Sequence, residues 1–265
     1  MEDVTVAEVG PSGARVAYDD LGSGEPALLL MPGWCANRTV FRRLAPLLSR
    51  RRRVLALDWR GHGGSDAASA DFGEDGLMQD ALAVVAANGA REVVPVALAH
   101  AGWIAIELAR RLGARVPRMI LIDWLVLGAP PPFREALAGM QSPETWRPTL
   151  DRLFDFWLHG VGDREVERFV REEMGSHGFP MWSRAGREIA RAYDREGSPL
   201  QALARLSPPV PTLHVYATPD DPEFLRAQQD FAAGHPWFRV RKLEAKTHFP
   251  VIEAPEDLAA EILAD

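Results

Sequence analysis

A histidine and an aspartate occupy positions typical of a proton-transferring pair. His248 lies in "KTHFPVIEAPEDLA", a loop between the last predicted strand and the final helix, and Asp123 ends the apolar stretch "RMILID". A histidine base needs a carboxylate to hold its tautomer and to stabilise the imidazolium. An unpaired carboxylate at the end of an apolar strand would be costly. We therefore predict that Asp123 is the partner of His248.

The nucleophile that such a pair usually activates is absent. The stretch "VPVALAHAGWIAIELARRLG", residues 94–113, is typical of a buried strand, a sharp turn and a helix. In the α/β-hydrolase layout this turn is a G-x-S-x-G elbow with an exposed serine, but the corresponding residue is Ala99, between Leu98 and His100. Such a site can accept a proton but cannot form an acyl-serine intermediate.

A second position could supply the carboxylate. Asp220 and Asp221 follow the next predicted strand in "ATPDDPEF", which is where α/β-hydrolases usually carry their acid. The run "PDDPE" is equally typical of a turn and a helix cap. We favour Asp123 over this alternative.

Anion binding requires backbone N–H groups rather than particular side chains. The elbow and the loop "PGWC" predict the amides of Trp34 and His100 as donors. We expect Cys35 to line the pocket rather than to act as a reactive thiol. The His100 side chain either faces the pocket or packs at the helix start, and Trp157 in "LFDFWLHG" either roofs the pocket or belongs to the core of a lid.

Apolar strands alternate with helical stretches, which predicts an α/β-hydrolase fold with a mostly parallel, doubly wound sheet. The predicted strands are 14–20, 26–31, 53–58, 92–98, 118–123, 211–217 and 238–244; the predicted helices are 39–49, 75–88, 101–113, 223–233 and a last one from 255. Residues 130–206 show helical patterns without a convincing strand. We predict a helical cap at 130–206 and a core of 1–129 and 207–265. The cap follows the strand 118–123, which corresponds to the sixth strand of the α/β-hydrolase fold. Ligands bind outside the carboxyl ends of such strands.

Composition narrows the functional classes. The chain has 265 residues, 47% of them hydrophobic, a formal net charge of -7 and one cysteine, and its pI is about 5.6. The acidic balance argues against nucleic acid and anionic membranes as partners. A lone cysteine fits a reducing cytoplasm, and neither a signal segment nor an apolar run long enough to span a bilayer is evident. We expect a cytoplasmic globular protein.

Neither a metal nor an organic cofactor is expected. The remaining histidines lack metal-ligand grouping; they include His159, His177, His214 and His235. The first strand–helix turn lacks the glycine-rich fingerprint of dinucleotide-binding proteins.

Several motifs together resemble one family, the cofactor-independent 2,4-dioxygenases of 3-hydroxy-4(1H)-quinolones, which are bacterial enzymes with the α/β-hydrolase fold. The resemblance covers nearly the whole chain and rests on "PGWC", "DWRGHG", "IDWL" and "FDFWLHG". It implies His248 as base, Asp123 as its partner, Trp157 as a pocket tryptophan, and Trp34 and His100 in the oxyanion-binding turn. It also implies a small aromatic N-heterocyclic substrate and O2 as reaction partners, with N-acylanthranilate and carbon monoxide as products.

The chain departs from this family at three positions. Members carry a histidine after the "GWC" cysteine and a histidine–serine pair at the elbow, where this chain has Ala36, Leu98 and Ala99. The resemblance implies that the serine assists binding without forming a covalent intermediate, so Ala99 is compatible with activity. A more apolar pocket favours a 2-alkyl substrate. Two alternatives are a hydrolase or lyase that uses the same base, and a non-catalytic quinolone-binding homologue.

Overall fold

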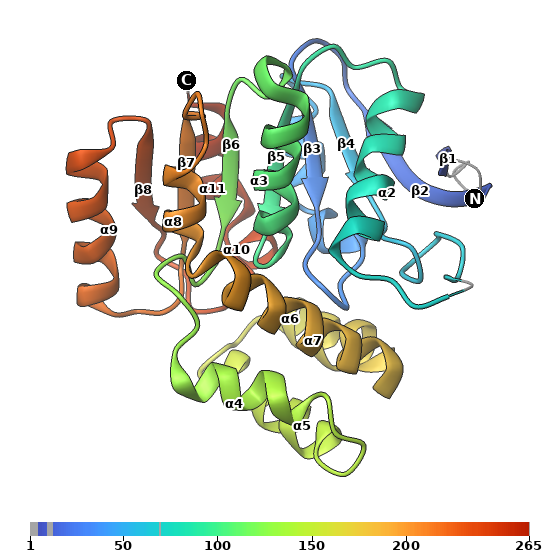
Figure 1. Ribbon diagram of the computed structural model, residues 1–265, viewed down its shortest axis with the longest axis vertical. Helices are drawn as coiled ribbons and strands as arrows, with labels where there is room; N and C mark the ends of the chain where they lie inside the picture. Colours follow the sequence, from blue (N-terminus) through green and yellow to red (C-terminus); the bar gives the residue numbers. More distant parts are fainter. Residues whose placement is uncertain (1–4, 10–12, 69, 265) are drawn as a thin grey trace.

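The fold is built on an eight-stranded sheet, seen in a computed structural model that describes residues 5–9, 13–68 and 70–264. The strand order is β1-β2-β4-β3-β5-β6-β7-β8 (Figure 1). The strands are β1 (Thr5–Val9), β2 (Ala14–Leu21), β3 (Ala27–Met31), β4 (Val54–Leu57), β5 (Val93–Leu98), β6 (Met119–Ile122), β7 (Thr212–Tyr216) and β8 (Phe238–Lys242). β2 pairs antiparallel with both β1 and β4, and the remaining neighbours in the sheet pair parallel. The predicted fold class is confirmed, although β1 was not predicted.

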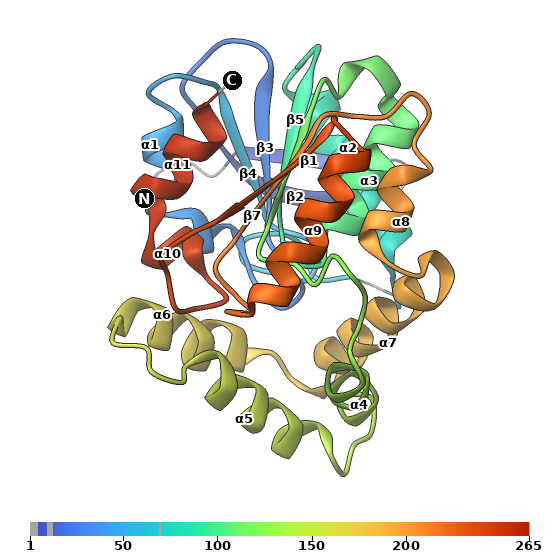
Figure 2. The ribbon, with the colours of Figure 1, turned by 90° about the vertical axis from the view of Figure 1, so that its left-hand side faces the viewer.

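Helices cover both faces of the sheet, which explains why β3 to β7 are buried along their whole length and why β3 to β6 are entirely apolar. Figure 2 shows α2, α3, α8 and α9 on one face and α1 and α11 on the other. Their bounds are α1 (Ala45–Leu48), α2 (Glu74–Ala87), α3 (Ala101–Leu112), α8 (Pro199–Ala204), α9 (Pro222–Gly234) and α11 (Pro255–Leu263). Shorter turns are η2 (Arg38–Phe41), η3 (Gly113–Arg115) and α10 (Pro250–Glu253).

The single helix predicted at 39–49 is wrong, because this stretch forms η2 and α1 separately. Pro46 lies in the first turn of α1. Proline has no N–H to donate and its ring clashes with a preceding helical turn, so it is tolerated only at a helix start.

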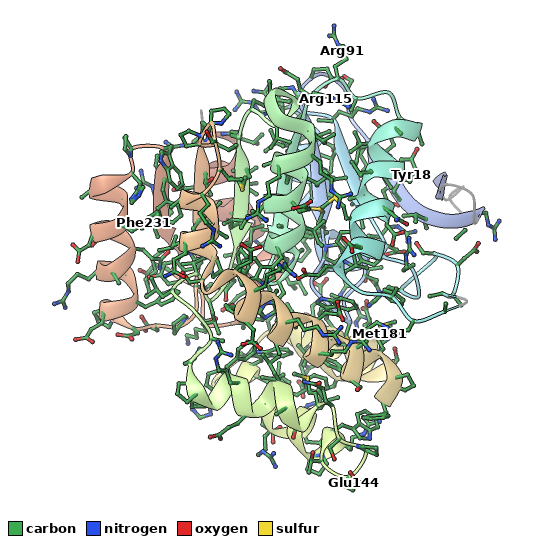
Figure 3. All side chains as sticks on the ribbon, viewed as in Figure 1. Tyr18, Arg91, Arg115, Glu144, Met181 and Phe231 are labelled. Atoms are coloured by element: carbon green, nitrogen blue, oxygen red, sulfur yellow. The ribbon has the colours of Figure 1, made fainter. Side chains whose placement is uncertain are left out.

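Between β6 and β7 the chain is helical, and most of these helices lie across the carboxyl ends of the strands (Figures 1 and 2). They are α4 (Pro131–Gly139), α5 (Trp146–Trp157), α6 (Arg164–Arg168), the π-helical turn η4 (Phe169–Glu173), η5 (Met174–Ser176) and α7 (Phe179–Glu196). Figure 3 shows Glu144 at the far end of this layer and Met181 where α7 meets the core. We call α4 to α7 the cap; α8 instead lies against α3.

Ion pairs hold the cap against the core on two sides. On one side Arg42 pairs with Glu173 at 3.1 Å. On the other side Asp71 forms ion pairs with Arg184 and Arg187, each with a nitrogen–oxygen distance of 2.9 Å. The cap is therefore fastened at both of these edges. Within the described residues, no helix is both long and apolar enough to cross a membrane.

Candidate active site

Three loops at the carboxyl edge hold residues in left-handed backbone conformation. Cys35 has φ 60°, Ala99 has φ 49° and Asp123 has φ 45°, and they are the non-glycine residues with positive φ in the described part of the chain. They follow β3, β5 and β6. Side chains disfavour this conformation, and it concentrates at functional sites. The strained positions therefore mark one place at the edge of the sheet.

The elbow retains its shape although it carries no serine. The amide of Ala99 donates to the carbonyl of Ile122 at 2.8 Å, and α3 begins two residues later. A Cβ on Gly102 would overlap the ring of Trp124, so glycine is required there. Backbone pairing and close packing, rather than the nucleophile, maintain the turn.

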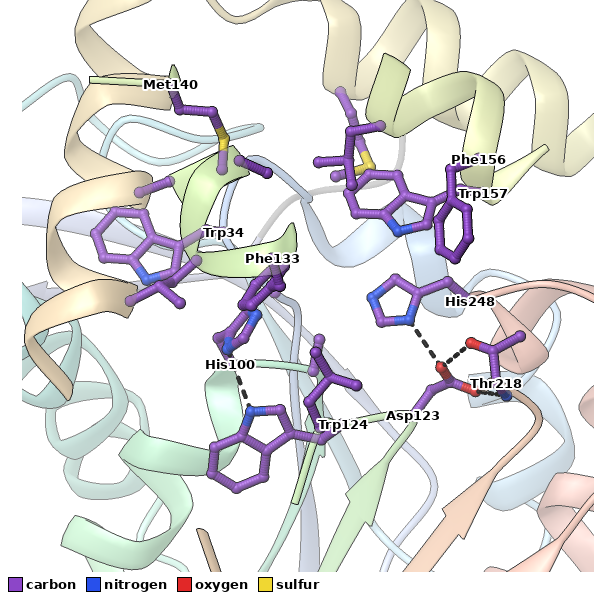
Figure 4. Close-up of a pocket in the computed structure, with 18 of the residues that line it drawn as sticks. Trp34, His100, Asp123, Trp124, Phe133, Met140, Phe156, Trp157, Thr218 and His248 are labelled. Atoms are coloured by element: carbon purple, nitrogen blue, oxygen red, sulfur yellow. Dashed lines mark hydrogen bonds and ion pairs between the residues drawn. The ribbon is translucent and has the colours of Figure 1, made fainter. Parts of the chain in front are cut away.

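His248 and Asp123 are joined by a hydrogen bond of 2.7 Å between Nδ1 and Oδ1 (Figure 4). Asp123 is only 1% exposed, and its other oxygen accepts the amides of Ala217 at 2.7 Å and Thr218 at 3.0 Å. The Thr218 hydroxyl donates to Oδ1 at 2.7 Å. These donors stabilise the carboxylate in its buried position.

The alternative carboxylates have other partners. Asp220 pairs with Lys242 at 2.6 Å on the surface, and Asp221 caps α9 by accepting the amide of Glu223 at 2.8 Å. The structure therefore joins His248 to Asp123 rather than to Asp220 or Asp221.

The loop after β8 presents His248 to the cavity. Glu253 accepts the amides of Lys246 and Thr247, and the Thr247 hydroxyl accepts the amide of Phe249. Because Nδ1 faces Asp123, the second ring nitrogen, Nε2, is the atom that can accept a proton. Trp157 from α5 stacks on the imidazole with ring centroids 5.3 Å apart and planes at 21° (Figure 4).

The amides of Trp34 and His100 meet no protein acceptor among the described residues. This is the arrangement expected for two anion-binding donors. By contrast, the amide of Cys35, the residue after Trp34, donates to Nε2 of His62 at 3.2 Å. The Nδ1–H of His62 donates to the carbonyl of Arg60 at 3.0 Å, and burial lowers the pKa of His62 to about 3. A neutral histidine from the "DWRGHG" loop thus supports the predicted anion-binding loop.

These groups surround one cavity of about 630 Å³ between the sheet edge and the cap. Most predicted site residues line it: Trp34, Ala36, Leu98, Ala99, His100, Asp123, Trp157 and His248. Cys35 does not, contrary to our expectation. It is 1% exposed and burial raises the pKa of its thiol well above the ordinary value. The left-handed turn at Cys35 leaves its neighbours on the cavity and its own side chain in the core.

The cavity is mainly apolar. The core lines it with Ala36, Leu98 and Ala99. The cap and the loop before it contribute mostly apolar side chains, which include Pro130, Pro132, Phe133, Ala136, Met140, Leu153, Phe156, Met174, Trp182, Ala185 and Ile189. Thr218, Trp124 and Phe133 were missed by sequence reasoning. The position of Thr218 after β7, at the same edge as Asp123, was the available signal. No cluster of three or more possible metal ligands occurs in the described residues.

The fold and site have clear relatives. The chain matches the alpha/beta hydrolase family over residues 28–261. It is 39% identical to the 2-heptyl-3-hydroxy-4(1H)-quinolone dioxygenase of Mycobacteroides abscessus, over 95% of this chain and 94% of that protein. The chain belongs to the 3-hydroxy-4-quinolone dioxygenases of the alpha/beta hydrolase family. The resemblance drawn from the motifs is thereby confirmed.

Another member of this dioxygenase family, the 1H-3-hydroxy-4-oxoquinoline 2,4-dioxygenase of Pseudomonas putida, is 38% identical over 95% of this chain and 96% of its own length. Among solved structures, an AqdC variant in complex with its substrate, the Pseudomonas quinolone signal, superposes with a TM-score of 0.93. It is 38% identical, covering 98% of this chain and 97% of the other.

Proposed function

We propose that this protein is a metal- and cofactor-independent dioxygenase that cleaves the heteroring of a 2-alkyl-3-hydroxy-4(1H)-quinolone. The products are an N-acylanthranilate and carbon monoxide. The observation that carries the proposal is the His248–Asp123 hydrogen bond of 2.7 Å beside an elbow without a nucleophile. The named activities of relatives at 37–39% identity support it.

The first step is removal of a proton from the substrate. Nε2 of His248 takes the proton of the 3-hydroxyl, and Asp123 stabilises the imidazolium that forms. Trp157 lies parallel to the imidazole, so its π-face is placed to stabilise the positive charge further.

The electron-rich anion then reacts with O2. One electron passes from the anion to O2, and recombination of the two radicals forms a bond between C2 and oxygen. The distal peroxide oxygen attacks C4, and the C4 oxygen becomes an alkoxide that the amides of Trp34 and His100 stabilise. Cleavage of the O–O, C2–C3 and C3–C4 bonds releases C3 with its own oxygen as carbon monoxide. Both atoms of O2 remain in the product, and His248 returns its proton to solvent.

The apolar lining of the cavity favours an alkyl group on C2. Ala36, Leu98 and Ala99 present no polar group to the ligand, and Met140, Phe156 and Ile189 extend the apolar surface into the cap. Burial of such a chain is favourable in proportion to its apolar area.

The decisive experiment is oxygen uptake by metal-stripped protein with 2-heptyl-3-hydroxy-4(1H)-quinolone, with carbon monoxide assayed in parallel. We expect one O2 consumed and one carbon monoxide released per substrate. Ester hydrolysis without oxygen uptake would instead identify a hydrolase that uses His248 to activate water. Saturable binding without any product would identify a non-catalytic quinolone-binding protein. Either result overturns the proposal.

A further inference from the structure

A buried chain of hydrogen bonds behind the cavity has a fixed direction. It begins on α9, where the side-chain N–H of Gln228 donates to the carbonyl of Phe224 at 3.1 Å. The amide oxygen of Gln228 lies 2.5 Å from Nδ1 of His214. Nε2 of His214 accepts a hydrogen bond from the backbone N–H of Trp124 at 3.3 Å. His214 therefore carries its proton on Nδ1. Burial lowers its pKa to about 4, which keeps this tautomer neutral.

The indole of Trp124 is a second donor, separate from its backbone N–H, and is directed toward the cavity. Its Nε1–H donates to Nδ1 of His100, with 3.2 Å between the two nitrogens. An indole N–H can only donate, so Nδ1 of His100 must accept and cannot carry a proton. Burial, followed by the charge of His248, lowers the pKa of His100 to about 3. A neutral imidazole with a bare Nδ1 holds its proton on Nε2.

The ring of His100 is held in place by aromatic neighbours. Phe133 of α4 stacks on it with centroids 5.4 Å apart and planes at 8°, and Tyr193 of α7 meets it edge-on at 5.9 Å. Tyr193 stays protonated because burial raises its pKa, and its hydroxyl donates to the carbonyl of Leu125 at 3.1 Å. His248 is the other titratable histidine on this cavity, and Figure 4 shows it across the site from His100.

The Nε2–H of His100 remains without a protein acceptor in the part of the chain that the structure describes. His100 lines the cavity, and its Nε2 is not among the occluded polar atoms that lack a partner. The donor is thus open to the ligand space. A donor enclosed in an apolar cavity is costly unless it finds an acceptor.

We propose that the His100 side chain binds the ligand, donating from Nε2 to an oxygen that carries a lone pair. This role is additional to that of the His100 backbone amide. Since the tautomer is locked, the imidazole can donate a hydrogen bond to the ligand but cannot accept one from it. It therefore selects oxo and oxyanion groups over N–H and O–H donors. The identity of the ligand rests on the proposed function. In a 3-hydroxy-4(1H)-quinolone the acceptors are the 4-oxo group and the ionised 3-oxygen, so His100 would orient the oxygen-bearing edge of the ring toward the elbow.

Binding of two inert probes tests the contact. The probes are 2-heptyl-4(1H)-quinolone, which has the oxo acceptor but no 3-hydroxyl, and 2-heptylnaphthalene, which has no hydrogen-bonding group. We expect His100→Phe to weaken the first probe about 3- to 10-fold, as for loss of one neutral hydrogen bond, and to leave the second nearly unchanged. An equal effect on both probes would overturn the contact, because it would reflect altered packing alone.

The tautomer can be tested in the unsubstituted protein, independently of how the variant folds. Long-range ¹H–¹⁵N spectra of histidine-labelled protein should show His100 neutral and protonated on Nε2 from pH 6 to 8, with its Nε2 signal shifting when 2-heptyl-4(1H)-quinolone binds. Assignment would use the signal lost in His100→Phe, or in His100→Gln if the first variant is unstable. The inference is overturned if His100 is an imidazolium, if it carries its proton on Nδ1, or if its Nε2 chemical shift does not change when the probe binds. Neither test requires turnover, so a failure of the dioxygenase proposal would appear separately, as absent oxygen uptake with this probe contact intact.

Discussion

The hydroxyl of Thr218 and Nδ1 of His248 share one oxygen, Oδ1 of Asp123, and each lies 2.7 Å from it. The two backbone amides of Ala217 and Thr218 occupy the other oxygen. These donors hold the buried carboxylate in the position from which it faces His248. The Thr218 hydroxyl is the only side-chain donor besides His248 among the described residues that contact Asp123.

Replacing Thr218 by valine should lower kcat/KM about tenfold. Valine keeps the backbone amide and the shape, but it removes the hydroxyl that donates to Oδ1 of Asp123. A hydrogen bond to a charged group contributes about 1.5–3 kcal/mol, and its loss should leave the carboxylate less firmly placed against His248. Thr218→Ser retains the hydroxyl and serves as the control. Equal kcat/KM values for the valine and serine variants would show that the hydroxyl does not position the carboxylate.

Replacing His248 by alanine should lower turnover by about 10²- to 10⁴-fold, the usual contribution of a general base. Binding of the quinolone, measured without oxygen, should largely persist because the apolar lining is unchanged. His159→Ala, at an exposed position, controls for loss of a histidine elsewhere. Normal turnover in His248→Ala would show that another group removes the proton.

Acid should destabilise the fold before the carboxylates titrate. Burial lowers the pKa of His62 and His100 to about 3 and that of His214 to about 4, against about 6.5 in the unfolded chain. The unfolded state therefore binds more protons, and stability present above pH 6.5 is lost as pH falls toward the folded pKa values. Each histidine contributes up to about 1.4 kcal/mol per pH unit.

Urea unfolding at pH 7.5, 6.5 and 5.5 measures this effect. With all three histidines, the free energy of unfolding should fall by about 1 kcal/mol from pH 7.5 to 6.5 and by about 3 kcal/mol from pH 6.5 to 5.5. His214→Gln should reduce each of these decreases by about one third. A free energy of unfolding that stays constant from pH 6.5 to 5.5 would show that these histidines accept protons in the folded state.

Affinity should rise with the length of the 2-alkyl group. Each fully buried methylene contributes about 0.8 kcal/mol, so burial of only two of the additional methylenes would make a heptyl quinolone bind about tenfold more tightly than its methyl analogue. Anaerobic titration of methyl, propyl, pentyl and heptyl compounds gives the series. A flat or inverted series would contradict the assignment of the apolar lining to the alkyl group.

Gly102→Ala should destabilise the protein, because the new methyl group would overlap the Trp124 ring. Overpacking of this kind costs about 1–3 kcal/mol, and displacement of Trp124 should also disturb the tautomer of His100. Gly234→Ala is a matched control, since no atom lies within 4 Å of its added methyl group. Thermal melting compares the two, and equal melting temperatures would show that Trp124 moves at little cost.

Much of the framework could be predicted from local sequence. Apolar runs such as "RMILID" and the turn at Ala99 predicted strands, the elbow and the layer of helices between β6 and β7, because strand and turn preferences depend on neighbouring residues. The pairing of His248 with Asp123 was also predicted, from the cost of an unpaired carboxylate at the end of a buried strand. The division at 130–206 into a cap and a core remains a prediction.

Only the tertiary structure decided how the side chains meet. It turned Cys35 away from the cavity, laid Trp157 over His248, and added Thr218 to Asp123. The tautomer of His100 depends on Trp124, a residue from another strand end. Local sequence determines where a strand or turn forms, but the direction of a hydrogen bond depends on which distant donors and acceptors the packed sheet brings together.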